Sequence, residues 1–539
     1  MLGLGCLIAA PATADLAAAT YRSDLFARVG FTLWDNGWYG GHPLPAYSVL
    51  APALGWLIGP RLVAVASMTI AAALFATLIE DRFPARATRI AAAWFALGAA
   101  ISLLSWRVAF DLGLATGLGA LLLAQRERRA PALALAALCA FASPVAGAFL
   151  ALCALAWALA GRRLTSVHRF AWFPVLLALA ALAPIVLLAI AFPEGGYQPF
   201  DASAFYPALA GVLLIAALIP SERSASPSPK AAAADGAGGS GARVLRTGAP
   251  LYAVALTGAY VLTTPVGGNA DRLGALVAGP LAACLLVDRR GIGWRPRVLL
   301  VLAPFLLYWQ ANAPVADFAS AASSPSVHAS YYAPLLRELD GLGVGYSEHP
   351  ARIEVVPTAD HWDASFVAAH VAIARGWERQ LDTGRNALFY ESTPLTPARY
   401  RAWLSEQAVS YVALPDAPLD YSAQSEASLL SKSPLPYLRE VWRSPHWRLF
   451  AVLGGRALSQ PPTVLTQLGE DSFTLQTPRA GTFTVRVRFT PYWALASGHG
   501  CVLRAPGDWT LLRAPASGSM RVVIDFTLAR VFDHGPRCR

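Results

Sequence analysis

The chain has 539 residues, of which 55% are hydrophobic and 14% are charged, and its formal net charge is +10. This low charge and the positive mean hydropathy exclude an ordinary soluble enzyme. Because the basic residues gather at the ends of apolar runs, they indicate membrane topology, and we expect no nucleic acid among the partners.

Apolar runs follow one another from residue 1 to about residue 312. Most are close to the length of about 20 residues that crosses the hydrocarbon core of a bilayer. The first run has no basic residue before Arg22, which favours a first span over a signal peptide. Pro144 separates two short runs, and we predict a break there rather than one kinked helix. We predict eleven spans, at residues 1–19, 61–79, 90–105, 109–124, 131–143, 145–160, 171–191, 206–220, 249–264, 273–287 and 297–312.

The basic residues of the loops alternate between the two sides of this predicted bundle. Seventeen Lys and Arg residues fall in one set of loops and five in the other. Since basic residues near span ends stay in the cytoplasm, the richer set is cytoplasmic. It includes residues 221–248, whose Ser, Pro, Gly and Ala content is typical of a flexible linker. The loop after the first span then faces outward, and the part after residue 312 is extracytoplasmic.

The first outer loop is rich in acids and aromatic residues. Apolar residues at four-residue intervals in DLFARVGFTLW predict a short helix along the membrane surface. Asp24 begins this stretch, and Asp35, Trp38, Tyr39 and His42 follow it in WDNGWYGGH. A partly desolvated carboxylate at a membrane surface can act as a general base or hold a cation. The alternative is an ordinary aromatic belt with two solvated acids.

Two further outer loops carry polar residues between apolar runs. FPEGGYQPFD contains Glu194, and TTPVGGNADRLG contains Asn269, Asp271 and Arg272. A single arginine at an outer surface that is otherwise poor in basic residues suits an anionic phosphate. These loops therefore favour a site on the outer face of the membrane.

The remainder of the chain is not apolar enough to span and divides into two predicted domains. Residues 320–460 mix helix-like stretches with short strand-like ones, such as RIEVVP and SYVALP, which predicts an α/β domain. Residues 461–539 alternate polar and apolar positions, which predicts a small antiparallel β domain. With the membrane part at 1–312, the predicted fold is a polytopic α-helical membrane protein with a C-terminal extracytoplasmic α/β plus β region.

Two groups of residues in this outer region have chemistry worth testing. Cys501 and Cys538 lie where disulfides persist, so we predict a bridge between them. DHWDASFVAAH and RGWERQ bring together histidines and acids that could hold a metal, with an arginine beside them, but their spacing fits no zinc motif, and ion pairs are the favoured interpretation. These residues are His361, Asp363, His370, Glu378 and Arg379.

The first loop, YRSDLFARVGFTLWDNGWYGGHPLPAYSVLAPAL, is similar to the acid-rich loop of uncharacterised bacterial, especially actinobacterial, members of the GT-C class of membrane glycosyltransferases. ASPVAGAFL, TPVGGNADRLG, RGWERQLDTGRNALFY and RVRFTPYWALASGHG also resemble that group. The resemblance covers most of the chain, although no single motif is specific. It implies a GT-C-like membrane domain, a polyprenyl-phosphate-linked sugar as donor, and an envelope glycan or glycolipid as acceptor.

The resemblance also implies roles for the loop residues. Asp24 matches the essential loop aspartate by position and would act as general base, with Asp35 as a second catalytic residue that could hold a cation. Trp38, Tyr39, His42, Glu194, Asn269 and Arg272 would bind substrate, with Arg272 on the lipid phosphate. A divalent cation, Mg²⁺ or Mn²⁺, could assist, but no close pair of acids such as Asp-x-Asp is present, so no metal ligand is assigned.

Two other classes of function remain open at this point. A transporter, or a non-catalytic protein that binds lipid or glycan, could use the same loop, although a transporter should show paired interrupted spans related by internal symmetry. A scaffold that recruits envelope proteins through its outer domains is the third class. Substitutions in the first loop would leave a scaffold's function intact.

Overall fold

The structure, a computed structural model, describes residues 1–161, 172–219, 235–287, 294–347, 349–432 and 434–539. The chain divides into two compact units. We call residues 1–11, 46–189 and 197–319 the helical unit, and residues 12–45, 190–196 and 320–539 the mixed unit. The first outer loop and the Glu194 turn therefore belong to the same unit as the C-terminal part.

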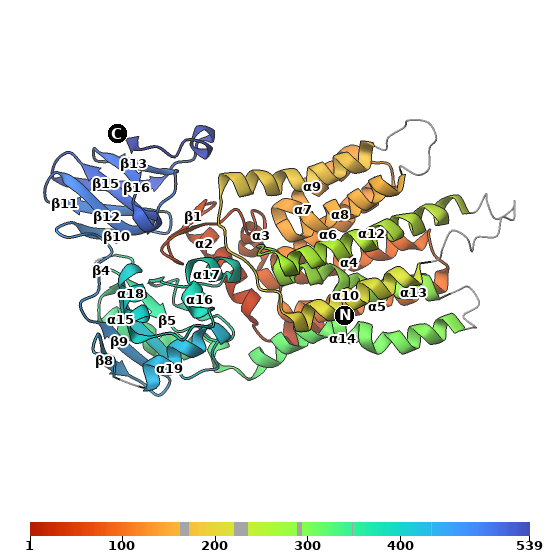
Figure 1. Cartoon of the computed structure of the whole chain (residues 1–539), viewed down its shortest axis with the longest axis horizontal. Helices are drawn as coiled ribbons and strands as arrows, with labels where there is room; N and C mark the ends of the chain where they lie inside the picture. Colours follow the sequence, from red (N-terminus) through yellow and green to blue (C-terminus); the bar gives the residue numbers. More distant parts are fainter. Residues whose placement is uncertain (162–171, 220–234, 288–293, 348, 433) are drawn as a thin grey trace. The chain divides into compact units, whose positions relative to one another are not determined.

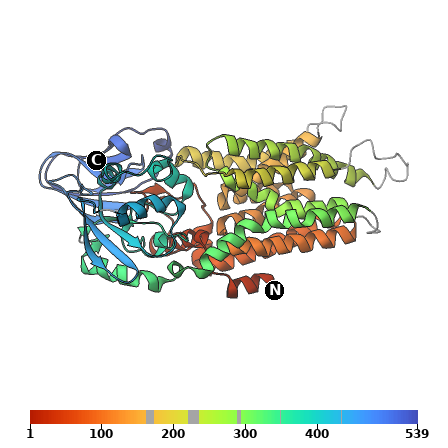
Figure 2. The same ribbon diagram turned by 60° about the horizontal axis from the view of Figure 1, so that its bottom comes forward.

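The helical unit is a bundle of apolar helices that lie side by side (Figure 2). One of its cores is built mainly from alanines of α6, α7, α8 and α9, which let the helix backbones approach closely. Its helices are α1 (Leu2–Ala9), α3 (Ala51–Ile58), α4 (Pro60–Glu80), α5 (Ala85–Ser102), η1 (Leu103–Ser105), α6 (Val108–Gln125), α7 (Arg129–Ala142), α8 (Pro144–Gly161), α9 (Trp172–Ala191), α10 (Ala202–Leu218), α12 (Asp235–Val261), η3 (Gly267–Asp271), α13 (Arg272–Leu286) and α14 (Trp294–Ser323).

The eleven predicted spans fall on helices, but the number of spans is not established. Among the described residues, six helices are long and apolar enough to cross a membrane, namely α4, α5 with η1, α6, α8, α9 and α14. A seventh span results if α1 and α2 (Ala14–Val29) form one broken span. The predicted first span, 1–19, is interrupted at residues 10–13, and the predicted break at Pro144 is present, since Ser143 is extended between α7 and α8.

The predicted linker is only partly a linker. Helix α12 begins at Asp235, so the second half of residues 221–248 is helical. The first half, residues 221–234, lies outside the described residues. Composition alone was misleading here, because residues 235–248 contain five glycines and two alanines, which disfavours a helix, and yet they belong to α12.

The mixed unit contains an α/β region, in which β5, β8 and β9 are labelled in Figure 1. It is built on a five-stranded sheet with the order β6-β5-β7-β9-β8. Strand β5 is parallel to β6 and β7. Strand β9 pairs antiparallel with β7 on one side and with β8 on the other. The carboxyl ends of the three parallel strands share one edge, which is where α/β sheets commonly bind ligands. Its elements are η4 (Pro325–Val327), α15 (Ala329–Gly341), β3 (Val344–Gly345), β4 (His349–Pro350), β5 (Arg352–Val355), α16 (Asp363–Phe366), β6 (Ala372–Ile373), α17 (Arg379–Arg385), η5 (Ala387–Phe389), α18 (Pro397–Glu406), β7 (Val409–Pro415), η6 (Tyr421–Ala423), α19 (Gln424–Lys432), β8 (Leu438–Arg443) and β9 (Trp447–Val452).

The rest of the mixed unit is a sandwich of two four-stranded antiparallel sheets, β10-β11-β16-β13 and β12-β15-β14-β17. Cys501 in β14 lies opposite Cys538 in β17, and the two are joined by a disulfide. Trp34 from the first outer loop packs in the sandwich core against Trp493. The strands are β10 (Val464–Leu468), β11 (Ser472–Thr477), β12 (Gly481–Arg488), β13 (Trp493–Ser497), β14 (Cys501–Arg504), β15 (Trp509–Ala514), β16 (Gly518–Ile524) and β17 (Arg537–Cys538), with η7 (Pro506–Asp508) and η8 (Leu528–Val531).

The first outer loop differs from its prediction. Helix α2 begins at Ala14 and ends at Val29. The next residue, Gly30, caps the helix with a positive φ of 75°. A two-stranded ribbon follows, β1 (Trp34–Asp35) with β2 (His42–Pro43). Trp38 and Tyr39 do not form an aromatic belt, because both side chains are buried within the mixed unit.

Candidate functional site

Three ionisable side chains meet inside the mixed unit. His42, Glu194 and Glu378 each place one potential ligand atom so that the three atoms lie within 4.8 Å of one another. His42 begins β2, Glu194 lies in the turn after α9, and Glu378 precedes α17 after strand β6. We call this group the His42 cluster.

The β1–β2 ribbon and the aromatic rings around it fix the position of His42. The residue is paired with Asp35 across the ribbon, and its ring stacks on Trp38 with 5.6 Å between ring centres. Trp38 also stacks on Tyr21, with 4.5 Å between ring centres. Trp38 is fully buried, and its predicted role in binding a sugar stays a prediction. Tyr39 is likewise buried, and its ring meets His42 edge to face.

The surroundings keep the His42 imidazole neutral. Burial lowers the pKa of His42 well below its usual value, and the cations Arg22 and Arg385 lower it further. The ring is fully buried; within the described part of the chain neither ring nitrogen has a hydrogen bond of normal geometry, although backbone groups of Asp35 and Trp38 interact with the ring and partly offset the lowering of its pKa. A neutral imidazole with an unused lone pair is the form that ligates metal ions.

Glu194 reaches the cluster from a tight glycine turn. Gly195 and Gly196 have φ values of 74° and 77°, which side chains rarely adopt. A Cβ on Gly196 would lie 1.7 Å from the carbonyl oxygen of Gln380. The turn thus needs glycine both for its conformation and for its contact with α17. Burial, followed by the neighbouring Glu378 carboxylate, raises the pKa of Glu194 well above its usual value, and its Oε1 is buried without a hydrogen-bond partner among the described residues.

Glu378 is held from several directions. Arg22 Nη2 donates to Glu378 Oε2 at 2.6 Å, and both side chains are almost completely buried. Gln380 Nε2 donates to Oε1 at 3.1 Å, and the Glu378 backbone N–H donates to the Tyr39 hydroxyl at 3.0 Å. A buried charge needs such partners, since an unpaired one is costly. Glu378 therefore has a fixed orientation toward His42 and Glu194.

Asp35 is not one of the three residues of the cluster but lies next to His42. Its side chain is fully buried and accepts hydrogen bonds from the Tyr21 hydroxyl at 3.1 Å and from Gly37 N–H at 2.8 Å. Burial is the main cause that raises the pKa of Asp35 to about 7. Its Oδ2 is 3.9 Å from His42 Nδ1. A role in orienting the imidazole fits this geometry better than direct contact with substrate.

The chemistry of the His42 cluster fits a divalent cation. One imidazole nitrogen and two carboxylates are a donor set that suits Mn²⁺ and similar ions. Orphaned atoms on His42 and Glu194 show that ligand atoms are available in a buried place. Without a cation, a proton bound between Glu194 and Glu378 would relieve the repulsion of the two carboxylates. The raised pKa of Glu194 agrees with this alternative.

The other predicted site residues are not members of this cluster. Asp24 is exposed on α2, unlike its neighbours Ser23 and Leu25, and remains a prediction. Asn269 lies in η3 and Arg272 begins α13, both in the helical unit.

Two predictions about RGWERQ and DHWDASFVAAH can now be compared with contacts. Arg379 and His361 both contact Asp420, at 2.5 and 3.2 Å, as the ion-pair interpretation expects. Glu378, in contrast, joins the His42 cluster. Its place in the segment that leaves the carboxyl end of β6, five residues after the strand ends, was the available signal, because such segments commonly carry ligand-binding side chains.

No protein-family model matches the chain, and no curated protein matches it. Among solved structures, the chain is similar to the archaeal oligosaccharyltransferase AglB from Archaeoglobus fulgidus, determined in complex with an inhibitory peptide and a dolichol-phosphate. The identity is 12%, the TM-score is 0.40, and the match covers 75% of this chain and 66% of AglB.

Proposed function

We propose that the protein is a membrane glycosyltransferase that moves a sugar from a polyprenyl-phosphate donor to an acceptor of the cell envelope on the outer membrane face. The observation that carries the proposal is the His42 cluster. It gathers a neutral imidazole, two carboxylates and the guanidinium of Arg22 from segments up to 356 residues apart. Buried ionisable groups with strongly shifted pKa values are typical of functional sites. The sequence resemblance to the GT-C class supplies the reaction type.

In the proposed reaction, Asp24 takes the proton from an acceptor hydroxyl. The hydroxyl oxygen forms a bond to the anomeric carbon of the donor sugar, with inversion at that carbon, while the bond from that carbon to the phosphate oxygen breaks. The polyprenyl phosphate leaves with the electron pair, and Arg272 stabilises its charge. The exposure of Asp24 agrees with a base that must meet an incoming acceptor.

A divalent cation is the proposed cofactor, held by His42, Glu194 and Glu378. When bound, it would supply positive charge for a phosphate oxygen. The chain's own part is to hold the three ligand atoms together, with Arg22 fixing Glu378 and the glycine turn fixing Glu194. Mn²⁺ is favoured over Mg²⁺ because one ligand is an imidazole nitrogen.

Replacement of Asp24 by Asn tests the proposed base. Membranes that contain the full chain would be supplied with radiolabelled polyprenyl-phosphate sugars, and transfer into envelope material would be measured. We expect Asp24→Asn to lower transfer by a factor of about 10²–10⁴. Asp340→Asn, at an exposed acid on α15, is the matched control and should keep the wild-type rate.

Each result has a defined meaning. Transfer that survives Asp24→Asn unchanged removes Asp24 as the base. Transfer that is absent from the wild-type chain with every donor favours the second candidate, a non-catalytic protein that binds lipid or glycan. The buried arginines of the mixed unit would then serve to bind an anionic ligand without reaction.

A further inference from the structure

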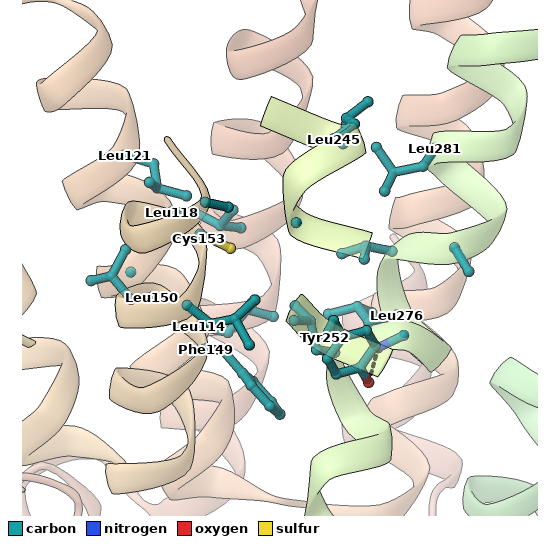
Figure 3. A pocket seen from close by; sticks show the side chains of 18 of the residues that line it. Leu114, Leu118, Leu121, Phe149, Leu150, Cys153, Leu245, Tyr252, Leu276 and Leu281 are labelled. Carbon is teal, nitrogen blue, oxygen red and sulfur yellow. Dashed lines mark hydrogen bonds between the residues drawn. The ribbon is translucent and has the colours of Figure 1, made fainter. Parts of the chain in front are cut away.

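Apolar surface in the helical unit is expected, because its helices are of the kind that lie in a bilayer. The apolar cavity of about 330 Å³ between these helices belongs to the same surroundings (Figure 3). The mixed unit is different. Within its described residues, Phe532 and Leu528 are the most exposed large apolar side chains, at 84% and 77%. Both belong to residues 525–536, between β16 and β17, which we call the apolar loop.

The apolar loop is held in one conformation by a buried arginine. Arg530 donates through Nε to the carbonyl of Pro491 at 2.9 Å. It also donates through Nη1 to Asp533 Oδ2 at 2.9 Å and through Nη2 to the carbonyl of Gly535 at 2.8 Å. One guanidinium thus ties both halves of the loop to each other and to the sandwich.

The backbone of the loop forms a short helical stretch. The N–H of Asp533 donates to the carbonyl of Ala529 at 3.0 Å, directly after η8. Leu528 and Phe532 therefore stand one turn apart on this stretch. Their exposure is built into the loop, and it does not come from a loose tail.

Helix α9 relates the apolar loop to a bilayer. The helix has 20 residues and is among those that are long and apolar enough to cross a membrane. Twenty helical residues measure about 30 Å, which is the thickness of the hydrocarbon core, so such a span needs its whole length. The last residue, Ala191, then lies at the membrane surface. Ile190 and Ala191 already belong to the mixed unit.

The apolar loop is attached to this end of α9. The Tyr492 hydroxyl donates to the carbonyl of Ala191 at 2.5 Å, which satisfies one of the carbonyls left over at the end of a helix. Phe192, the next residue, packs on Phe526 of the loop with 5.9 Å between ring centres, and Phe526 contacts Tyr492 at 5.0 Å. The loop therefore lies at the depth at which α9 leaves the bilayer.

We infer that the apolar loop is a membrane-surface anchor, which places Leu528 and Phe532 between the headgroups and the acyl chains of the leaflet where α9 ends. Apolar side chains presented at this depth bury their surface in that boundary region. A protein partner is the less suitable occupant, because two side chains offer far less than the roughly 800 Å² per partner of a specific protein interface. The inference does not depend on the sugar-transfer reaction.

Photocrosslinking in a bilayer tests the anchor. The full chain is reconstituted in nanodiscs of phosphatidylcholine and phosphatidylglycerol with tritiated acyl chains, and p-benzoylphenylalanine replaces Phe532 or Leu528. Irradiation should attach lipid to the chain at both positions. The matched control is position 464, because Val464 is also an exposed apolar residue of the sandwich but lies on β10, at the edge of its sheet away from β16 and β13. Position 464 should take up no lipid above the background without irradiation.

A charged variant separates insertion from chance collision. Leu528→Asp should lower lipid labelling at position 532 by about tenfold, because a carboxylate resists transfer out of water. Val464→Asp adds the same charge elsewhere and should leave that labelling unchanged. Both side chains are exposed, so both variants should fold. Equal lipid labelling at positions 464, 528 and 532 overturns the inference, and so does a crosslink from position 532 to another protein chain in place of lipid.

Discussion

The chemical state of His42 is set by its neighbours and not by its own sequence context. Its ring is enclosed by Trp38 and Tyr39, and Asp35 lies behind it. A histidine in an outer loop would ordinarily titrate near pH 6.5. Here burial and two nearby arginines keep it neutral, which makes it a potential ligand at every physiological pH.

Metal binding can therefore be measured without an activity assay. We expect Mn²⁺ at about 100-fold excess over its Kd to stabilise the full chain by about 2.7 kcal/mol, read as a rise in the thermal unfolding midpoint in detergent. His42→Gln and Glu194→Gln should each abolish this rise. His370→Gln, at an exposed histidine of the same unit, should keep it. A rise that persists in both cluster variants would place the ion elsewhere.

The buried carboxyl group of Glu426 should make the stability of the fold depend on pH. Glu426 accepts from the Tyr400 hydroxyl at 2.7 Å and lies close to the fully buried Glu354. Burial raises the pKa of Glu426 to about 7. Between about pH 4.5 and pH 7 the folded chain keeps a proton that the unfolded chain has released, so stability falls as the pH rises through this window.

Glu426→Gln should remove this dependence, because the amide stays neutral and can still accept from Tyr400. We expect the variant to be more stable than the wild type at pH 8, by on the order of 1–3 kcal/mol, and close to it at pH 5. Thermal midpoints at the two pH values provide the measurement. An equal difference between variant and wild type at both pH values would contradict the assignment.

The site residues were partly accessible from sequence. Asp35, His42 and Glu194 were singled out because acids and aromatic residues are unexpected beside apolar runs. Glu378 was considered as a possible metal ligand, but together with His361, Asp363 and His370 and with ion pairs favoured, because the spacing of its own segment does not reveal its contact with His42 and Glu194. Trp38 and Tyr39 were expected at the membrane surface, because interfacial and buried aromatic residues have the same composition. Only tertiary contacts distinguish the two environments.

At the scale of elements, the turn at Gly195–Gly196 and helix α17 fit together without side chains between them. Gly384 of α17 faces Gly196, and a Cβ on Gly384 would lie 2.9 Å from the Gly196 Cα. This contact positions Glu194 against Glu378. The turn is therefore a structural requirement of the His42 cluster.

Two glycine substitutions separate strain from collision. Gly196→Ala places an alanine at a positive φ, which costs about 1 kcal/mol, and its Cβ also collides with Gln380. The variant should therefore have a lower unfolding midpoint and a weaker stabilisation by Mn²⁺. Gly195→Ala has the same conformational cost, but its Cβ meets nothing within 4 Å. It should lower the midpoint slightly and keep the Mn²⁺ effect. Identical behaviour of the two variants would show that the contact with α17 does not matter.

Element types followed from sequence better than element boundaries did. Apolar runs gave helices because a run of that length satisfies its backbone hydrogen bonds internally. Alternation in FTVRVRF gave strand β12, one face of which packs in the sandwich core. The start of α12 at Asp235 and the start of α2 at Ala14 were not predicted, since neither coincides with a change in composition.

At the scale of the whole molecule, the chain order and the spatial order differ. Residues 12–45 and 190–196 join the C-terminal part rather than the helices beside them in sequence. Periodicity describes neighbours along the chain, so it could not reveal this association. The partition of polar loops between units needed the contacts themselves, such as Arg22 with Glu378.

The outer location of the mixed unit remains a prediction that the disulfide can test. In protein purified from membranes without reductant, Cys501 and Cys538 should be joined, and treatment with a reductant should add the mass of two hydrogens to the C-terminal peptides. Cys538→Ser should show no such shift. The bridge closes a loop of about 37 residues, so its loss should also destabilise the unit by about 3–4 kcal/mol. Fully reduced thiols in the isolated protein would argue for a reducing compartment.

The insertion of Trp34 into the sandwich core has a consequence for biosynthesis. Trp34 is synthesised more than 400 residues before its partner Trp493. The first outer loop therefore cannot reach its final packing until all later helices have been made. A fragment that starts at residue 320 would lack Trp34, and the core of its β-sandwich would be incompletely filled. We expect such a fragment to aggregate when expressed alone, and to be rescued by co-expression of residues 1–319.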